Sequence, residues 1–366
     1  MTNPTIKEFD YTDIQIISIL DKEHKISTEK ISELLDIPAR SIRYRLQRLR
    51  EKGIFQKKII ITHERKLGMR ESFFFIQENP KYLSQLFEIL DVNPAIWYVP
   101  STGKFSGFYV HTLDIIDLQN QSLNLIKELK KINIIIDYFY SEVIDFVNLE
   151  WNFSYFDKEG NWSWTWNFWK EMIQKRIGNN KIKTRKFEET HDKIKFDFLD
   201  IQILTNLYTD EIVPLKKIAD KLTLSESQIS RRIKTMEENG IIKGYRSGFY
   251  PFKELMTLDC IIEANTSMDI ILDLLKAIPY PCAFVYGKKN QIICEIDLPN
   301  DELLDFVNAF YELRPLVDLQ FIQIWHKHPQ LDPIILYEFF NEEINSWNFN
   351  KYYEKSLKKL ESIKLD

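Results

Sequence analysis

The stretch DYTDIQII at Asp10–Ile17 returns as DFLDIQIL at Asp197–Leu204, so the second copy of each residue lies 187 positions further on. The same offset, without a gap, superposes apolar positions, an arginine and a glycine: Ile31 on Ile218, Leu35 on Leu222, Ile42 on Ile229, Arg45 on Arg232 and Gly53 on Gly240. Chance similarity does not hold one register over so many positions of different kinds. The chain is therefore interpreted as a tandem duplication.

The repeat extends well beyond this first stretch. Pro94 matches Pro281 at the same offset, and Trp166-Asn167-Phe168 matches Trp347-Asn348-Phe349 at an offset of 181. The units therefore run from near residue 10 to near 178 and from near 197 to near 359. Between them, Gln174–Lys186 holds six Lys or Arg and no acid, which suits a solvated linker or a linker that also contacts phosphate.

Three helices and a strand are expected at the start of each unit. Apolar residues recur at helical spacing over 10–22, 27–35 and 39–52, and Gly53 is expected to end the third helix. The run 54–61 then reads as strand and wing. In the second copy, Ser225 followed by Gln228 has the spacing of a capping box at the start of the third helix. This order of elements is that of a winged helix-turn-helix.

The rest of each unit alternates strands and helices. In the first copy the strand-like segments are 71–77, 95–100, 107–112 and 134–144, and the helix-like ones are 82–90 and 122–131. The second copy repeats the pattern at 258–264, 268–277, 283–286, 291–297, 302–313 and 317–325. This β-α-β-β-α-β order is typical of a ferredoxin-like domain. Each unit then closes with an aromatic-rich segment around its Trp-Asn-Phe.

We therefore predict an α+β protein with two winged helix-turn-helix domains and two ferredoxin-like βαββαβ domains in tandem repeat. The predicted divisions are 8–66 and 196–252 for the helix-turn-helix domains and 67–150 and 253–330 for the βαββαβ domains. An aromatic tail with the basic linker is expected at 151–195, and a C-terminal helical tail at 331–366.

Composition excludes several classes of protein. The 366 residues are 44% hydrophobic and 28% charged, which is typical of a globular chain. No apolar run approaches the roughly 20 residues that cross a bilayer, and the first ten residues show no secretory pattern. Cys260, Cys282 and Cys294 form no CxxC pair, so we expect buried thiols and a cytoplasmic protein. No GxSxG, Walker, HExxH or GxGxxG motif supports nucleophilic, phosphoryl or dinucleotide chemistry.

The combination of these motifs resembles the leucine-responsive/AsnC (Lrp/AsnC) family of transcription regulators. The resemblance is clearest in the second copy, where it rests on Asp200, Leu224-Ser225, Arg232-Ile233 and the run Gly240 to Tyr245. It covers most of both units, apart from the linker and the aromatic tails. The resemblance implies a winged helix-turn-helix that binds DNA, followed by a RAM-like βαββαβ domain. Family members usually carry one unit per chain and act as dimers or larger assemblies, whereas this chain holds two units.

The third helix of the first copy carries the residues expected to contact DNA. Arg40, Tyr44 and Gln47 lie opposite the apolar stripe, and Arg43 and Arg48 flank them. Eight Lys or Arg and a single acid lie between Pro38 and Lys58, a basic patch that the net charge of −5 conceals. The predicted DNA-binding residues are Arg40, Ser41, Arg43, Tyr44, Gln47, Arg48, Lys57 and Lys58, with Ser227, Gln228, Ser230, Arg231 and Lys234 in the second copy.

The two recognition helices differ in chemistry, and this predicts the kind of site. A homodimer reads a palindrome because its two helices are identical. Two unlike helices on one chain should instead read an asymmetric double-stranded site, with the first copy contributing more of the salt-dependent affinity. A second copy of the chain is a further candidate partner, since βαββαβ sheets have edges and faces that invite assembly.

The resemblance also places an effector turn, at Thr102 and Gly103 in the first copy and at Gly287 in the second. The acidic residue expected after the turn is absent from both copies, and the second has lost the threonine as well. We therefore expect DNA binding and leave the effector unidentified. No cofactor, catalytic residue or metal site is predicted, and His326-Lys327-His328 is interpreted as chance because no further ligand accompanies it.

Two other readings remain open. Siroheme decarboxylases resemble the same regulator family and work as paired units in haem synthesis; they would need His and Arg clustered around a tetrapyrrole pocket. Alternatively, the helix-turn-helix units could serve as protein-interaction modules in a scaffold that binds no DNA. The five tryptophans between Trp151 and Trp169 could stack on bases, but packing between domains is the preferred interpretation.

Overall fold

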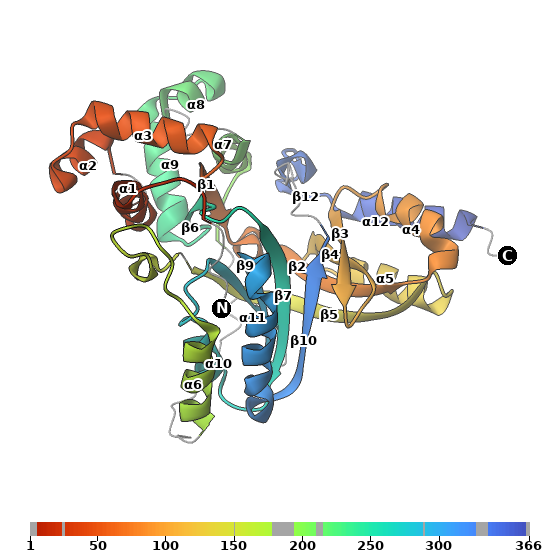
Figure 1. The fold of residues 1–366 in the computed structure, drawn as a ribbon. Helices are drawn as coiled ribbons and strands as arrows, with labels where there is room; N and C mark the ends of the chain where they lie inside the picture. The colour runs from red at the N-terminus through yellow and green to blue at the C-terminus, as the bar shows by residue number, and fades with distance from the viewer. Residues whose placement is uncertain are drawn as a thin grey trace.

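A computed structural model describes residues 6–23, 26–149, 151–177, 194–209, 215–287, 290–326 and 336–363. It divides into two helix-turn-helix domains that lie together at one end, and a large strand-rich body with helices on its outer surface (Figure 1). Both units have the α+β arrangement that their sequence predicts, so the tandem repeat of the two domain types is confirmed.

Each helix-turn-helix domain consists of three helices. The first has α1 (Tyr11–Lys22), α2 (Thr28–Leu35) and α3 (Ala39–Glu51), and the second has α7 (Phe198–Thr209), α8 (Leu215–Leu222) and α9 (Glu226–Glu238). A capping box formed by Asp10 and Asp13 starts α1, whereas no side chain caps α3, which follows Pro38. Gly53 follows α3 with a φ of +61°, a left-handed conformation that stops the helix at little cost for glycine.

Both βαββαβ domains are present. The first comprises β2 (Met69–Glu78), α4 (Leu83–Leu90), β3 (Ile96–Gly103), β4 (Gly107–Ile115), α5 (Gln121–Lys131) and β5 (Ile135–Leu149). The second comprises β7 (Leu255–Ala264), α10 (Met268–Leu275), β8 (Cys282–Gly287), β9 (Gln291–Pro299), α11 (Leu303–Phe310) and β10 (Val317–Trp325). Apolar residues alternate along these strands, so one face of each sheet packs on its helices and the other face is left to be covered.

The two sheets close on each other into an eight-stranded barrel in the order β10-β3-β4-β2-β5-β8-β9-β7. The seams are the antiparallel pairs β3–β10 and β5–β8, each of which joins one unit to the other. Aromatic side chains fill the interior, among them Phe73, Phe75, Tyr109, Phe321 and Trp325. Barrel closure pairs the strand edges that would otherwise invite a second chain. The two βαββαβ domains of one chain thus pair with each other.

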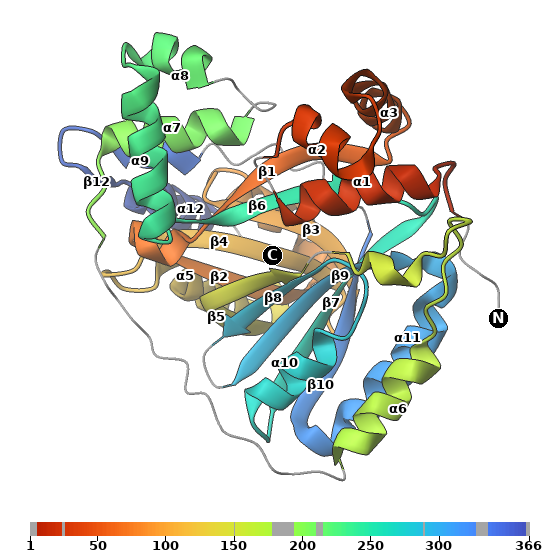
Figure 2. The ribbon, with the colours of Figure 1, turned by 90° about the vertical axis from the view of Figure 1, so that its left-hand side faces the viewer.

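The strand after each third helix pairs with its counterpart in the other unit. β1 (Phe55–Thr62) and β6 (Ile242–Phe249) form a two-stranded antiparallel ribbon beneath the two helix-turn-helix domains (Figure 2). The strand expected at 54–61 is thus present, and its partner comes from the other unit. β1 leads through a 3-10 turn at Glu64–Leu67 straight into β2, so no hairpin turn returns the chain to supply a local partner.

The aromatic tails are exchanged between the units. The first unit's tail, which ends in α6 (Trp166–Ile177), packs on α10 and α11 of the second unit, where Trp169 Nε1 donates to Leu274 O at 2.7 Å. The second unit's tail runs through β11 (Phe340–Asn341) and β12 (Ser346–Trp347) to α12 (Asn350–Ser362) and packs on α4 and α5 of the first. There Tyr353 OH donates to Leu113 O at 2.9 Å. The predicted helical C-terminal tail thus includes a short strand pair.

This exchange explains the tryptophan cluster. All five tryptophans between Trp151 and Trp169 are buried, and Trp151 Nε1 donates to Phe249 O at 2.9 Å. The packing interpretation is confirmed, and the alternative of stacking on bases is excluded because the rings are not accessible. The tail of the first unit shares one hydrophobic core with the first helix-turn-helix and the second βαββαβ domain. The halves are therefore interlocked and not merely connected.

A buried carboxyl group of the second unit accepts a hydrogen bond from the first unit's tail. Its protonation makes the stability of the fold depend on pH. Glu302 Oε2 accepts hydrogen bonds from Trp166 Nε1 and Tyr280 OH, both at 2.6 Å. Burial raises the pKa of Glu302 from 4.5 to about 7, with smaller contributions from Asp301 and Asp305. The folded protein therefore holds a proton that the unfolded chain releases between these two pH values.

We expect the free energy of unfolding to fall as pH rises from about 5 to 8, because the buried carboxylate must then be charged. Glu302→Gln should remove on the order of 2–3 kcal/mol of this pH dependence, the equivalent of a shift of about two pKa units. Urea denaturation at several pH values measures it. Glu171→Gln, at a side chain that is 64% exposed on α6, is the control and should leave the slope as it is. Equal slopes for the wild type and Glu302→Gln would contradict the prediction.

Candidate nucleic-acid interface

Both recognition helices have the apolar inner stripe that a helix-turn-helix requires. Ile42, Leu46 and Leu49 of α3 are buried in the core of the first domain, as the helical spacing predicts. Ile229, Ile233 and Met236 of α9 take the same positions in the second domain. The opposite face of each helix is left to solvent, and its side chains decide what the helix can bind.

The exposed face of α3 carries donors and one large aromatic ring. Arg40, Arg43, Tyr44 and Gln47 are exposed, Tyr44 with 68% of its surface, and Ser41 is half-buried. Within the described residues, Arg40 and Tyr44 have no hydrogen-bond or ion-pair partner. Arg43 Nη1 lies 2.7 Å from Glu29 Oε1 of α2, but exposed ion pairs are worth less than about 1 kcal/mol, so a phosphate can compete for this guanidinium.

The exposed face of α9 has fewer available donors. Gln228 Oε1 accepts from Ser225 N at 2.9 Å and completes the capping box predicted there, while Ser227 Oγ lies 2.9 Å from Ser225 Oγ. Lys234 Nζ lies 3.6 Å from Glu238, one turn along the helix. Ser230 and Arg231 are exposed on the same face. The two helices therefore present different chemistry, with the greater positive charge on α3.

Arg48 of the predicted contact set pairs with a buried carboxylate of its own domain. Arg48 donates to Asp13 Oδ2, and Arg45 Nη1 lies 2.8 Å from Asp13 Oδ1. Asp13 is fully buried, so removing either guanidinium would leave a poorly compensated charge in the core. The guanidinium of Arg48 thus braces α3 on α1 while its side chain stays 31% exposed, and its contact with DNA stays a prediction.

The arginine brace is the feature that the sequence interpretation overlooked. Asp200 and Arg232 form the same ion pair in the second copy, at 2.7 Å, 32 residues apart as Asp13 and Arg45 are. A charge pair that recurs at the offset of the duplication was the signal available in the sequence. The side chains of Lys57 and Lys58 lie outside the described part of the structure, as does the basic linker beyond residue 177.

The predicted effector residues lie at the two barrel seams. A Cβ on Gly103 would come within 2.1 Å of Ile322 O of β10, and one on Gly287 within 2.1 Å of Ser141 Oγ of β5. These glycines therefore allow sheets from the two units to approach closely. Thr102 Oγ1 lies 2.5 Å from His326 Nε2, and Gln323 Nε2 donates to Phe105 O at 2.8 Å, so side chains of the second unit hold the turn that the resemblance assigns to an effector.

The described residues contain no group of three or more His, Cys, Asp or Glu placed to hold a metal ion, and Lys327 and His328 of the predicted His-Lys-His run lie outside them. No helix among them is long and apolar enough to cross a membrane.

A family model and several curated proteins match parts of the chain. A family model described as winged helix-turn-helix DNA-binding matches residues 9–56 and 197–243. The HTH-type transcriptional regulator LrpA of Pyrococcus horikoshii is 35% identical over 78 residues, which cover 21% of this chain and 55% of that protein. A glutamyl-tRNA reductase of Clostridium novyi is 32% identical over 111 residues, which cover 26% of this chain and 27% of that protein. The chain thus spans about half of one curated relative and about a quarter of the other.

Solved structures of the siroheme decarboxylase NirDL resemble nearly the whole chain. The siroheme decarboxylase NirDL superposes with a TM-score of 0.52 over 96% of this chain and 99% of its own, at 12% sequence identity. At that identity the likeness concerns the fold alone.

Proposed function

Because the chain is a tandem pair of winged helix-turn-helix units of the leucine-responsive/AsnC type, we propose that it is a DNA-binding transcription regulator that reads an asymmetric double-stranded site. One chain supplies both recognition helices. The duplicated units act as a fused pseudo-dimer, with α3 directed to one half-site and α9 to the other.

The observation that carries this proposal is the difference between the exposed faces of two helices joined by one framework. α3 offers the exposed guanidinium of Arg40 and the exposed ring of Tyr44. α9 offers the exposed cations Arg231 and Lys234 beside hydroxyl groups and a glutamine engaged in its own cap, and three glutamates on the same helix offset its positive charge. Arginine and tyrosine donors suit guanine edges and phosphates, and short hydroxyl side chains suit closer and weaker contacts. The β1–β6 ribbon and the barrel tie the two domains to each other, so the spacing of the half-sites follows from the fold.

Selection of bound sites from a random double-stranded DNA pool, with the full chain, tests the proposal. We expect an enriched motif with two unlike half-sites, the stronger of which disappears when the α3 arginines are replaced. A palindromic motif would contradict the pseudo-dimer reading. The absence of any enriched or salt-sensitive binding would contradict DNA binding and favour a protein-interaction role for the helix-turn-helix domains.

The second candidate function is a decarboxylase of tetrapyrroles, and the likeness to NirDL over nearly the whole chain favours it. Against it, the barrel interior is filled by aromatic side chains. Each histidine in the described ranges also has a polar neighbour: His63 lies 3.5 Å from Asp145, His111 lies 2.9 Å from Glu71, and His326 lies beside Thr102. A titration of the protein with an iron porphyrin, followed by visible absorption, separates the candidates, and stoichiometric binding would replace our proposal by this one.

A further inference from the structure

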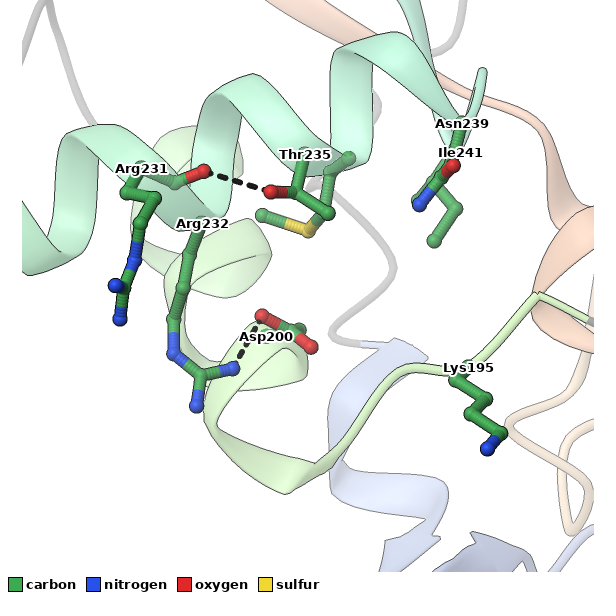
Figure 3. A pocket seen from close by; sticks show the side chains of 8 residues that line it. Lys195, Asp200, Arg231, Arg232, Thr235, Asn239 and Ile241 are labelled. Atoms are coloured by element: carbon green, nitrogen blue, oxygen red, sulfur yellow. Dashed lines mark hydrogen bonds and ion pairs between the residues drawn. The ribbon is translucent and has the colours of Figure 1, made fainter.

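A hollow of about 180 Å³ opens in the second helix-turn-helix domain, between α9 and the segment that leads into α7. Its polar lining comes from Lys195, Asp200, Arg231, Arg232 and Thr235. Arg231 and Arg232 extend from α9 on one side, Lys195 lies on the other, and Asp200 lies between them (Figure 3). This volume is more than ten times what one water molecule needs, so the hollow can admit a small organic ligand.

In the first copy, a side chain of the domain itself fills the equivalent place. The offset of the duplication superposes Arg48 on Thr235 and Asp13 on Asp200. In the first domain the Arg48 guanidinium binds Asp13 directly. In the second domain Thr235 is too short to reach the carboxylate, and its hydroxyl donates to Arg231 O at 3.0 Å instead. The hollow is therefore the space that a guanidinium occupies in the sister domain.

The carboxylate beneath the hollow retains an acceptor position. Asp200 Oδ1 lies 2.7 Å from Arg232 Nη1, as Asp13 Oδ1 lies beside Arg45 in the first copy. Asp200 Oδ2 accepts from Asp197 N at 3.1 Å, and among the described residues it has no second donor. In the first copy the equivalent oxygen accepts both from Asp10 N and from Arg48. A largely buried carboxylate oxygen that faces a hollow favours a charged hydrogen-bond donor there.

The rim of the hollow is positively charged, whereas the equivalent positions in the first copy hold an acidic and a neutral residue. Glu8 is replaced by Lys195 and Tyr44 by Arg231, so two cations now flank the opening. A simple cation would be repelled by this rim on its way to Asp200, whereas a ligand that also carries an anionic group would satisfy both ends.

We propose that this hollow binds a small zwitterionic ligand, with a guanidinium or primary ammonium group on Asp200 and a carboxylate or phosphate between Lys195 and Arg231. The cationic end takes the place that Arg48 holds in the sister domain. The proposal does not depend on DNA binding, because every group that it uses is present in the protein alone.

Isothermal titration calorimetry of the full chain without DNA tests the proposal, with arginine and agmatine as probes. Both carry a guanidinium, and agmatine lacks the carboxylate. We expect one arginine per chain, and binding of agmatine on the order of tenfold weaker because it forgoes the charged contact with the rim. Thr235→Arg should abolish binding by refilling the hollow as Arg48 does in the first copy. Asp200→Asn keeps the shape and should weaken arginine binding at least about tenfold.

The reverse substitution provides a matched control. Arg48→Thr should open a second hollow over Asp13, raise the stoichiometry to two, and bind agmatine in preference to arginine there, since Glu8 replaces Lys195 at that rim. Circular dichroism checks that each variant is folded. Absence of binding by either probe up to about 10 mM would overturn the proposal, as would undiminished binding by Thr235→Arg. Inorganic phosphate that binds the wild type as tightly as arginine would show that the rim acts without Asp200, which also contradicts it.

Discussion

Replacement of Trp169 by alanine is expected to lower the free energy of unfolding by about 3–5 kcal/mol, the largest stability effect that we predict for a single side chain. Trp169 is fully buried and lies against Phe306 of the opposite unit, with the two rings stacked at a centroid distance of 6.3 Å. Its Nε1 also satisfies Leu274 O, so the substitution leaves both a cavity and an unpaired carbonyl. Urea denaturation followed by far-ultraviolet circular dichroism measures the loss.

The control is the neighbouring residue. Phe168 is 59% exposed, so Phe168→Ala should change the free energy of unfolding by less than about 0.5 kcal/mol. Because Trp169 comes from the first unit and packs on the second, Trp169→Ala should also increase hydrogen exchange in α10 and α11, which belong to the second βαββαβ domain. A loss confined to the first unit, or equal effects of the two substitutions, would contradict the exchanged arrangement of the tails.

Joint replacement of Arg40 and Arg43 by alanine is expected to weaken DNA binding by about 30-fold or more, because each guanidinium removed costs at least roughly 1 kcal/mol. Both guanidiniums lie on the exposed face of α3, and together they can neutralise two phosphates. The dependence of log affinity on log salt concentration should then become shallower by about 0.9 for each phosphate that is no longer neutralised. Gel-shift titration of the selected site at several salt concentrations measures both quantities.

Joint replacement of Ser227 and Gln228 by alanine is the comparison on α9. These side chains are uncharged, so the salt slope should stay the same and the affinity should fall by less than about tenfold. Since Gln228 also caps α9, the stability of this variant has to be measured beside its affinity. Lys131→Ala serves as the charge control, because Lys131 pairs with Glu128 on α5, a helix of the body that lies apart from α3. Equal losses of DNA affinity from the α3 and α9 replacements would contradict the proposal that the chain binds an asymmetric site.

The sequence by itself determined the duplication, the order of elements and the inner stripe of each recognition helix. These are local properties: Ile42, Leu46 and Leu49 lie on one face because of helical geometry, whatever they pack against. The capping box of Ser225 and Gln228 likewise depends on residues three positions apart, and it forms as predicted.

What the tertiary structure decided is which copy each element packs against. β1 pairs with β6, α6 packs on α10 and α11, and α12 packs on α4 and α5, so each partner lies in the other unit. A duplicated chain offers each strand and tail two nearly identical partners, and local periodicity is the same for both, so the pattern cannot choose between them. The choice follows from chain geometry: β1 continues directly into β2 and cannot fold back on itself.

Arg48 shows the same limit at the level of one side chain. Its position on α3 fits an outward donor as well as an inward brace, and the carboxylate that captures it belongs to Asp13 on another helix, 35 residues away. Because Asp13 is buried, the loss of that ion pair would leave a poorly compensated charge in the core. Burial is set by the tertiary packing of the domain and not by local sequence. The duplication read from Asp10–Ile17 thus established that the chain holds two regulator-like units, and their packing established that the units are interlocked and unlike.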